Sequence, residues 1–101
     1  MIFRRRYSEL IGRQLDLFEE DNADLLVEAG EALRAYDAAP ADEAEARYAE
    51  FDELLDTGRE LLAELRDGVA RTVEEPDEYL AAFDRAATKR FPRLAAGLSD
   101  V

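Results

Sequence analysis

The best candidates for a chemical site in this chain, by residue type and spacing, are acidic residues. Glu20 and Asp24 lie four positions apart, and Glu53 and Asp56 lie three apart. Either spacing places both carboxylates of a pair on one face of an α-helix. Because Mg²⁺ prefers oxygen ligands from converging carboxylates, one hypothesis is a magnesium site formed between two helices.

These carboxylates lie in two segments, Glu19–Asp24 and Glu53–Asp56. The segments resemble the motifs of the all-α nucleoside triphosphate pyrophosphatases of the MazG type, in which a Glu-Glu-x-x-Glu helix accompanies a Glu-x-x-Asp helix. The resemblance covers only these segments, and the first departs from the family pattern. It implies a magnesium-dependent nucleotide hydrolase. The alternative is a solvated acidic surface, which is typical of a chain with 25 acidic residues among 101.

The chain contains neither histidine nor cysteine. Their absence excludes the commonest general base, the commonest transition-metal ligand, disulfides and thiolate nucleophiles. The di-iron chemistry of ferritin-like bundles is excluded as well, because it uses Glu-x-x-His pairs. We therefore expect no cofactor and no catalytic residue, with Mg²⁺ as the alternative.

Charge is divided unevenly along the chain. The net charge is −12, and residues 14–84 hold 23 acids against five arginines. The C-terminal part carries a basic patch of Arg85, Lys89, Arg90 and Arg93. We expect these cations to interact favourably with the negative end of their own helix dipole and with neighbouring acidic residues. The alternative is that they contact phosphates or an acidic partner.

A second basic segment lies near the N-terminus, at Arg4–Arg6. Cations at the start of a helix are disfavoured by its dipole, so they need compensation from nearby acids. We predict ion pairs with Glu74, Glu75 or Glu78.

Apolar residues recur in steps of three and four, which predicts helices over 3–37 and 41–73. Pro40 interrupts the first series and suits the first turn of the next helix, and Pro76 likewise starts a shorter helix over 76–91. A short turn over 92–98 follows. We therefore predict a single all-α domain over residues 1–101. Its expected architecture is a three-helix bundle, made of a long antiparallel α-hairpin and a shorter third helix.

Side-chain sizes along the two seams suggest how the helices meet. We expect Phe18 to face Gly58, since a large residue opposite a small one packs well. Asn22 interrupts an apolar coiled-coil series, and we interpret it as a buried residue that fixes register. The third helix is expected to dock on a stripe of helix 1 formed by Phe3, Tyr7, Leu10 and Leu17.

Four leucines flank the seams beyond the reach of the short third helix: Leu26, Leu33, Leu54 and Leu61. Uncovered apolar surface of this kind favours a partner, here a second copy or another helical protein. We therefore interpret the chain as a small, acidic, self-associating interaction or scaffold protein of the cytoplasm. The alternatives are the magnesium-dependent hydrolase and an acidic decoy for a basic protein surface. Neither a membrane nor nucleic acid is an expected partner.

Overall fold

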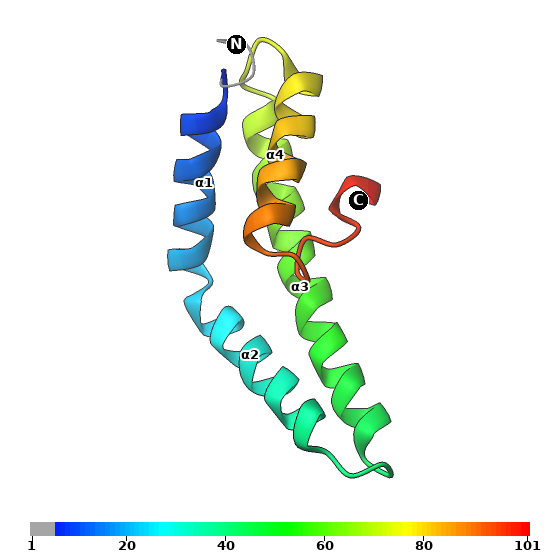
Figure 1. The fold of residues 1–101 in the computed structure, drawn as a ribbon. Coiled ribbons are helices and arrows are strands. Elements are labelled where there is room, and N and C mark those ends of the chain that lie inside the picture. The colour runs from blue at the N-terminus through cyan, green and yellow to red at the C-terminus, as the bar shows by residue number, and fades with distance from the viewer. Residues whose placement is uncertain (1–5) are drawn as a thin grey trace.

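The computed structural model describes residues 6–101, in which four α-helices are followed by a short 3₁₀ turn (Figure 1). The helices are α1 (Ser8–Asp21), α2 (Ala23–Ala38), α3 (Ala44–Ala70) and α4 (Pro76–Arg90), and the turn is η2 (Leu98–Asp100). The all-α fold class is confirmed. The prediction of three helices is wrong, because the first predicted helix is two helices.

Asn22 separates α1 from α2. Its backbone has φ −120° and ψ 28°, outside the helical range, and its side-chain Nδ2 donates to the carbonyl of Phe18 at 3.0 Å. A short polar side chain that bonds a carbonyl four residues earlier competes with regular helix. Asn22 is half-buried at this break. We expected Asn22 to be a buried residue that fixes the helix register. Instead, it is the residue at which one helix ends and the next begins.

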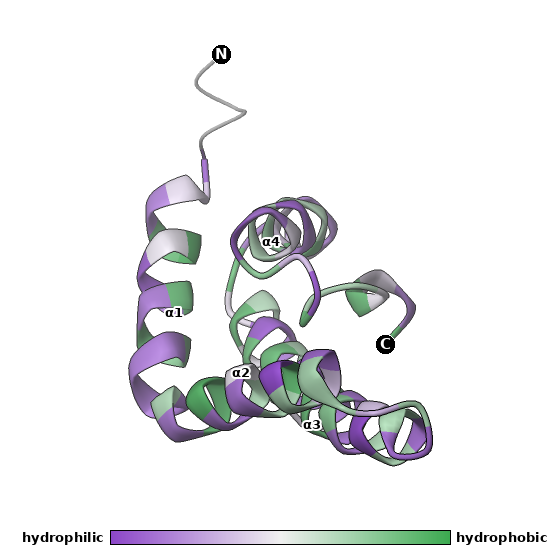
Figure 2. Cartoon of the chain, turned by 60° about the horizontal axis from the view of Figure 1, so that its bottom comes forward, coloured by the Kyte–Doolittle hydropathy of each residue, from purple (hydrophilic) through white to green (hydrophobic). Residues whose placement is uncertain are grey.

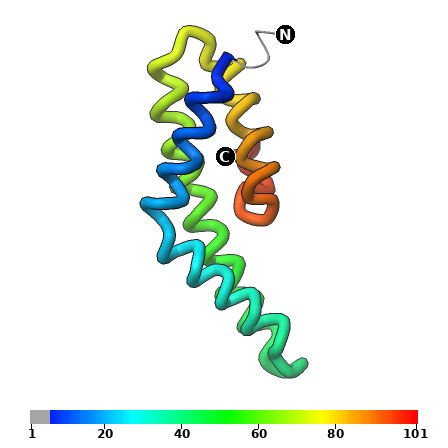
Figure 3. The backbone as a smooth tube through the Cα atoms, turned by 60° about the vertical axis from the view of Figure 1, so that its left-hand side comes forward, coloured from blue at the N-terminus to red at the C-terminus, as the bar shows by residue number. Residues whose placement is uncertain are grey.

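The break directs α1 and α2 to different partners. Helix α2 packs antiparallel along α3, whereas α1 packs against α4, which itself packs on α3. Figure 3 shows the hairpin of α2 and α3 extending well past the end of α4, in a molecule of 52 × 24 × 23 Å. We call this projecting part, residues 23–59, the distal arm.

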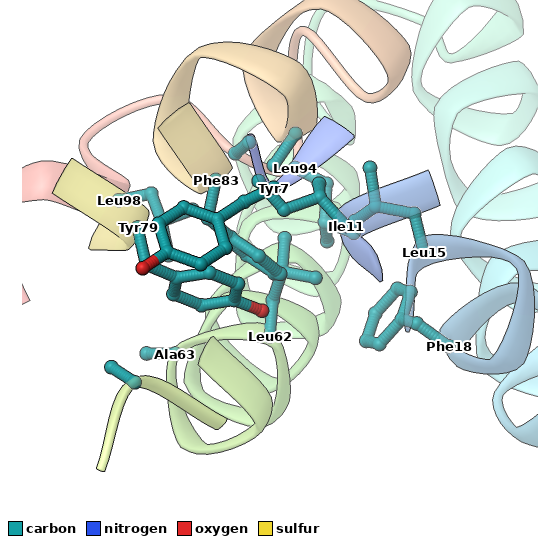
Figure 4. Packing of buried hydrophobic residues seen from close by; sticks show 13 residues of the cluster. Tyr7, Ile11, Leu15, Phe18, Leu62, Ala63, Tyr79, Phe83, Leu94 and Leu98 are labelled. Carbon is teal, nitrogen blue, oxygen red and sulfur yellow. The ribbon is translucent and has the colours of Figure 1, made fainter. Parts of the chain in front are cut away.

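The main core lies at the other end of the molecule, among α1, α3, α4 and the residues after α4 (Figure 4). Figure 2 shows the apolar side of α1 turned toward α4. Ile11, Leu15 and Phe18 of α1 are buried, as are Tyr79 and Phe83 of α4. The expected dock for the third helix is confirmed at Tyr7, whose ring packs edge-on against Tyr79 of α4 with centroids 5.5 Å apart, but Leu17 is 48% exposed and Phe3 lies outside the described residues.

Residues 91–101 fold back on the helices (Figure 1). The turn η2 packs on α4, and Arg66 of α3 donates hydrogen bonds to the backbone oxygens of Leu98 and Val101. Leu94, Ala95 and Leu98 of this C-terminal segment are buried. A Cβ atom built on Gly58 would clash with Leu94 and touch Leu25. The expected pairing of Gly58 with Phe18 is wrong. Phe18 instead meets Phe91, with ring centroids 5.7 Å apart, because α1, which ends just before Asn22, packs against α4 and not along α3.

Candidate functional site

The distal arm buries little of its own apolar surface. Among the sixteen residues of α2 only Ala29 is buried, whereas the fourteen residues of α1 include three buried side chains. In the half of α3 that faces α2, Phe51 and Gly58 are buried, and Phe51 stacks edge-on with Tyr48 at 6.3 Å. The two helices alone thus leave their flanking leucines only half-covered.

An open groove of about 320 Å³ runs along one side of the distal arm. Its floor and walls come from α2, from α3 and from the beginning of the C-terminal segment: Leu26, Ala29, Gly30, Leu33, Phe51, Leu55, Phe91, Pro92, Arg93 and Leu94. We call it the apolar groove. Arg93 is its one charged lining residue, and its guanidinium lies 6.0 Å from the centre of the Phe51 ring. No acidic residue lines it, in a chain with 25 of them.

The C-terminal segment, which forms one wall of the apolar groove, is bonded to Arg66, which is only 4% exposed. Its Nη1 donates to the carbonyl of Leu98 and to Asp84, both at 3.0 Å, and its Nη2 donates to the backbone oxygen of Val101 at 2.9 Å. Nε donates to Asp67 at 2.9 Å. Burial lowers the pKa of Arg66, but the hydrogen bonds and charges of Asp67 and Asp84 raise it further, so the net shift is upward. Arg66 therefore remains charged and holds the segment.

A second groove, of about 510 Å³, runs along the other side of the arm. We call it the acid-walled groove, and it is lined by Glu28, Glu31, Ala32, Ala35, Glu50, Glu53, Leu54 and Thr57. The two grooves share no lining residue. Residues 28, 32 and 35 each lie two positions from 26, 30 and 33, about half a turn of helix, so the grooves open on opposite sides of α2.

The structure distributes the predicted interface leucines over different surfaces. Leu26 and Leu33 line the apolar groove, and Leu54 lies in the acid-walled groove. Leu61 is 38% exposed on α3 and lines neither groove. The apolar groove adds Phe91 and Leu94 as lining residues, which sequence reasoning missed because they reach the groove only through the tertiary contacts of the C-terminal segment with α3.

The four carboxylates considered for magnesium lie at separate places. Glu20 borders a hollow beside Arg90, and Asp24 is exposed on α2. Glu53 is in the acid-walled groove, whereas Asp56 accepts a hydrogen bond from Arg59 at 2.8 Å. Within residues 6–101, no three acidic side chains are grouped in a way that could hold a metal ion.

The basic patch is divided between paired and free cations. Arg90 bonds Asp16 at 2.6 Å and also Glu19, and these carboxylates raise its pKa. Arg85 and Lys89 are exposed, and no carboxylate among the described residues pairs with either. Near the N-terminus, Arg6 pairs with Glu74 at 2.9 Å, as predicted, and Arg4 and Arg5 lie outside the described residues.

Every helix within residues 6–101 is too short or too polar to cross a lipid bilayer. Comparisons with protein-family models, with characterised proteins and with solved structures found no match for this chain.

Proposed function

We propose that this chain is a small helical protein-interaction module that self-associates through the apolar groove. The observation that carries the proposal is the incomplete packing of the distal arm. Only Ala29 of α2 is buried, while Leu26 and Leu33 border an open groove free of acidic residues. Two packed helices each bury one apolar stripe against the other. The apolar surface that remains exposed is usually covered by further helices.

Charge favours a second copy as the occupant of the apolar groove. At a net charge of −12, two copies repel each other over most of their surfaces. The apolar groove is a place where they can approach without opposing carboxylates, because its single charged lining residue is Arg93. A two-fold contact of this groove with itself would complete a closed helical bundle.

The favourable free energy of self-association comes from burying leucine side chains of the apolar groove. Full burial of one leucine contributes about 1.5 to 3 kcal/mol relative to exposure, and Leu26, Leu33 and Leu55 are each only half-buried. Association costs translational and rotational freedom of about 4 kcal/mol or more. Several leucines from both copies must therefore be covered together, which a groove-to-groove contact achieves.

The test is a pair of matched leucine substitutions followed by light-scattering mass. Leu33→Glu places a carboxylate inside the apolar groove and should yield a mass of one chain, 11.4 kDa. Leu61→Glu changes the net charge equally on an exposed leucine outside both grooves and should leave the dimer mass intact. Circular dichroism verifies that each variant remains helical. A dimer that survives Leu33→Glu would refute the apolar groove as the interface.

A further inference from the structure

The acid-walled groove combines an apolar floor with negative charge that is mostly unpaired. Ala32, Ala35 and Leu54 form the apolar part, and four glutamates stand around it. Within the described residues the only one of these glutamates in an ion pair is Glu50, which Arg47 reaches at 3.5 Å. No basic residue lines the groove. The self-association proposed above uses the opposite side of α2 and leaves this surface open.

From this combination we infer that the acid-walled groove docks a cationic amphipathic helix of another protein. The groove lies between two antiparallel helices, which is the position that a third helix takes in a bundle. Alanines at its floor let a partner helix come close, and apolar side chains at helical spacing on that partner would cover Leu54. Lysine or arginine on both flanks of the partner would meet glutamates from α2 on one side and from α3 on the other.

The extent of the groove sets the length of the partner segment. Its lining residues span 28–35 on α2 and 50–57 on α3. At 1.5 Å per residue each span is about 10 Å, or two helical turns. The partner is thus a short amphipathic segment with two or three apolar anchors and cations beside them.

A designed peptide tests this inference directly. The probe has about 15 residues, with leucine at every third or fourth position and lysine on the flanks, and a scrambled peptide of the same composition serves as control. Calorimetric titration into the intact chain should show one amphipathic peptide per chain. Raising the salt from about 0.05 M to about 0.5 M should weaken binding, because salt screens the flanking charges.

Matched charge reversals locate the peptide. Glu31→Lys with Glu53→Lys should weaken binding by about tenfold or more, since both carboxylates belong to the groove. Glu45→Lys with Asp52→Lys makes the same change of charge at exposed positions of α3 outside the groove and should have little effect. The Leu33→Glu variant should still bind, which separates this inference from self-association. No binding, equal binding of the scrambled peptide, or equal weakening by both reversals would overturn it.

Discussion

The side chain of Leu94 occupies the space that a Cβ atom on Gly58 would need. This contact joins the C-terminal segment to the middle of α3 and explains a glycine in a helix interior, where glycine costs about 1 kcal/mol relative to alanine. Leu94 is also a wall of the apolar groove. The close approach at Gly58 thus shapes the surface to which we assign self-association.

Filling the space at Gly58 should displace Leu94. We expect Gly58→Leu to lower the free energy of unfolding by about 1 to 3 kcal/mol through overpacking, as measured by urea denaturation. In a double-mutant cycle, Leu94→Ala should relieve part of that loss, because the two side chains compete for one space. Strictly additive effects would show that the two residues do not meet.

Arg66 should stabilise the protein by holding the C-terminal segment. Arg66→Met keeps most of the side-chain volume but leaves Asp84 and two backbone oxygens without their donor, so we expect a loss of about 3 kcal/mol. Trypsin should then cleave faster after the exposed Arg93. Arg71→Met, at an exposed position on the same helix end, is the control and should change neither quantity.

The hydroxyl of Tyr79 is buried, and it lacks a hydrogen-bond partner among the described residues. Since an unpaired buried hydroxyl costs free energy, Tyr79→Phe should raise the free energy of unfolding by about 1 kcal/mol. Tyr7→Phe should do the reverse, because the Tyr7 hydroxyl accepts a hydrogen bond from the backbone N–H of Glu75 at 3.1 Å. Thermal unfolding of both variants checks the opposite signs; a destabilising Tyr79→Phe would reveal a polar contact at that hydroxyl.

Alkaline pH provides a separate test of the burial of Tyr79. Desolvation raises the pKa of Tyr79 from 10.0 to about 12. The folded state therefore keeps a proton that the unfolded state loses, so this contribution to stability is complete below pH 10.0 and falls as the pH rises toward about 12. Unfolding free energies across this range should decline less steeply in Tyr79→Phe than in the unmodified chain. Equal slopes would contradict the burial.

Local signals were sufficient to predict most helix positions. Pro76 marks the start of α4 where predicted, and the third helix ends at Arg90, one residue earlier than expected. Pro40 correctly separates the second series from the first, although α3 begins only at Ala44. A proline constrains its own backbone, so its effect is readable without tertiary information.

The bend at Asn22 and the role of Arg66 required the tertiary structure. Apolar spacing continues unchanged through Asn22, so periodicity cannot distinguish a straight helix from two helices joined at an angle. The expected pairing of Gly58 with Phe18 was wrong for the same reason, since it assumed one straight helix over residues 3–37. Arg66 follows Leu62 by four positions on the apolar side of α3, which is the one sequence signal for a buried arginine. Its partners other than Asp67, however, lie 18 to 35 residues away.

The most direct test of self-association is the solution mass of the unmodified chain, measured by light scattering at about 0.05 M and about 0.5 M salt. We expect twice 11.4 kDa, with a larger dimer fraction at high salt on dilution, because salt screens repulsion between acidic copies and leaves the apolar contact intact. A monomer under both conditions would contradict self-association through the apolar groove. So would a dimer that dissociates at high salt, since its contacts would be ionic.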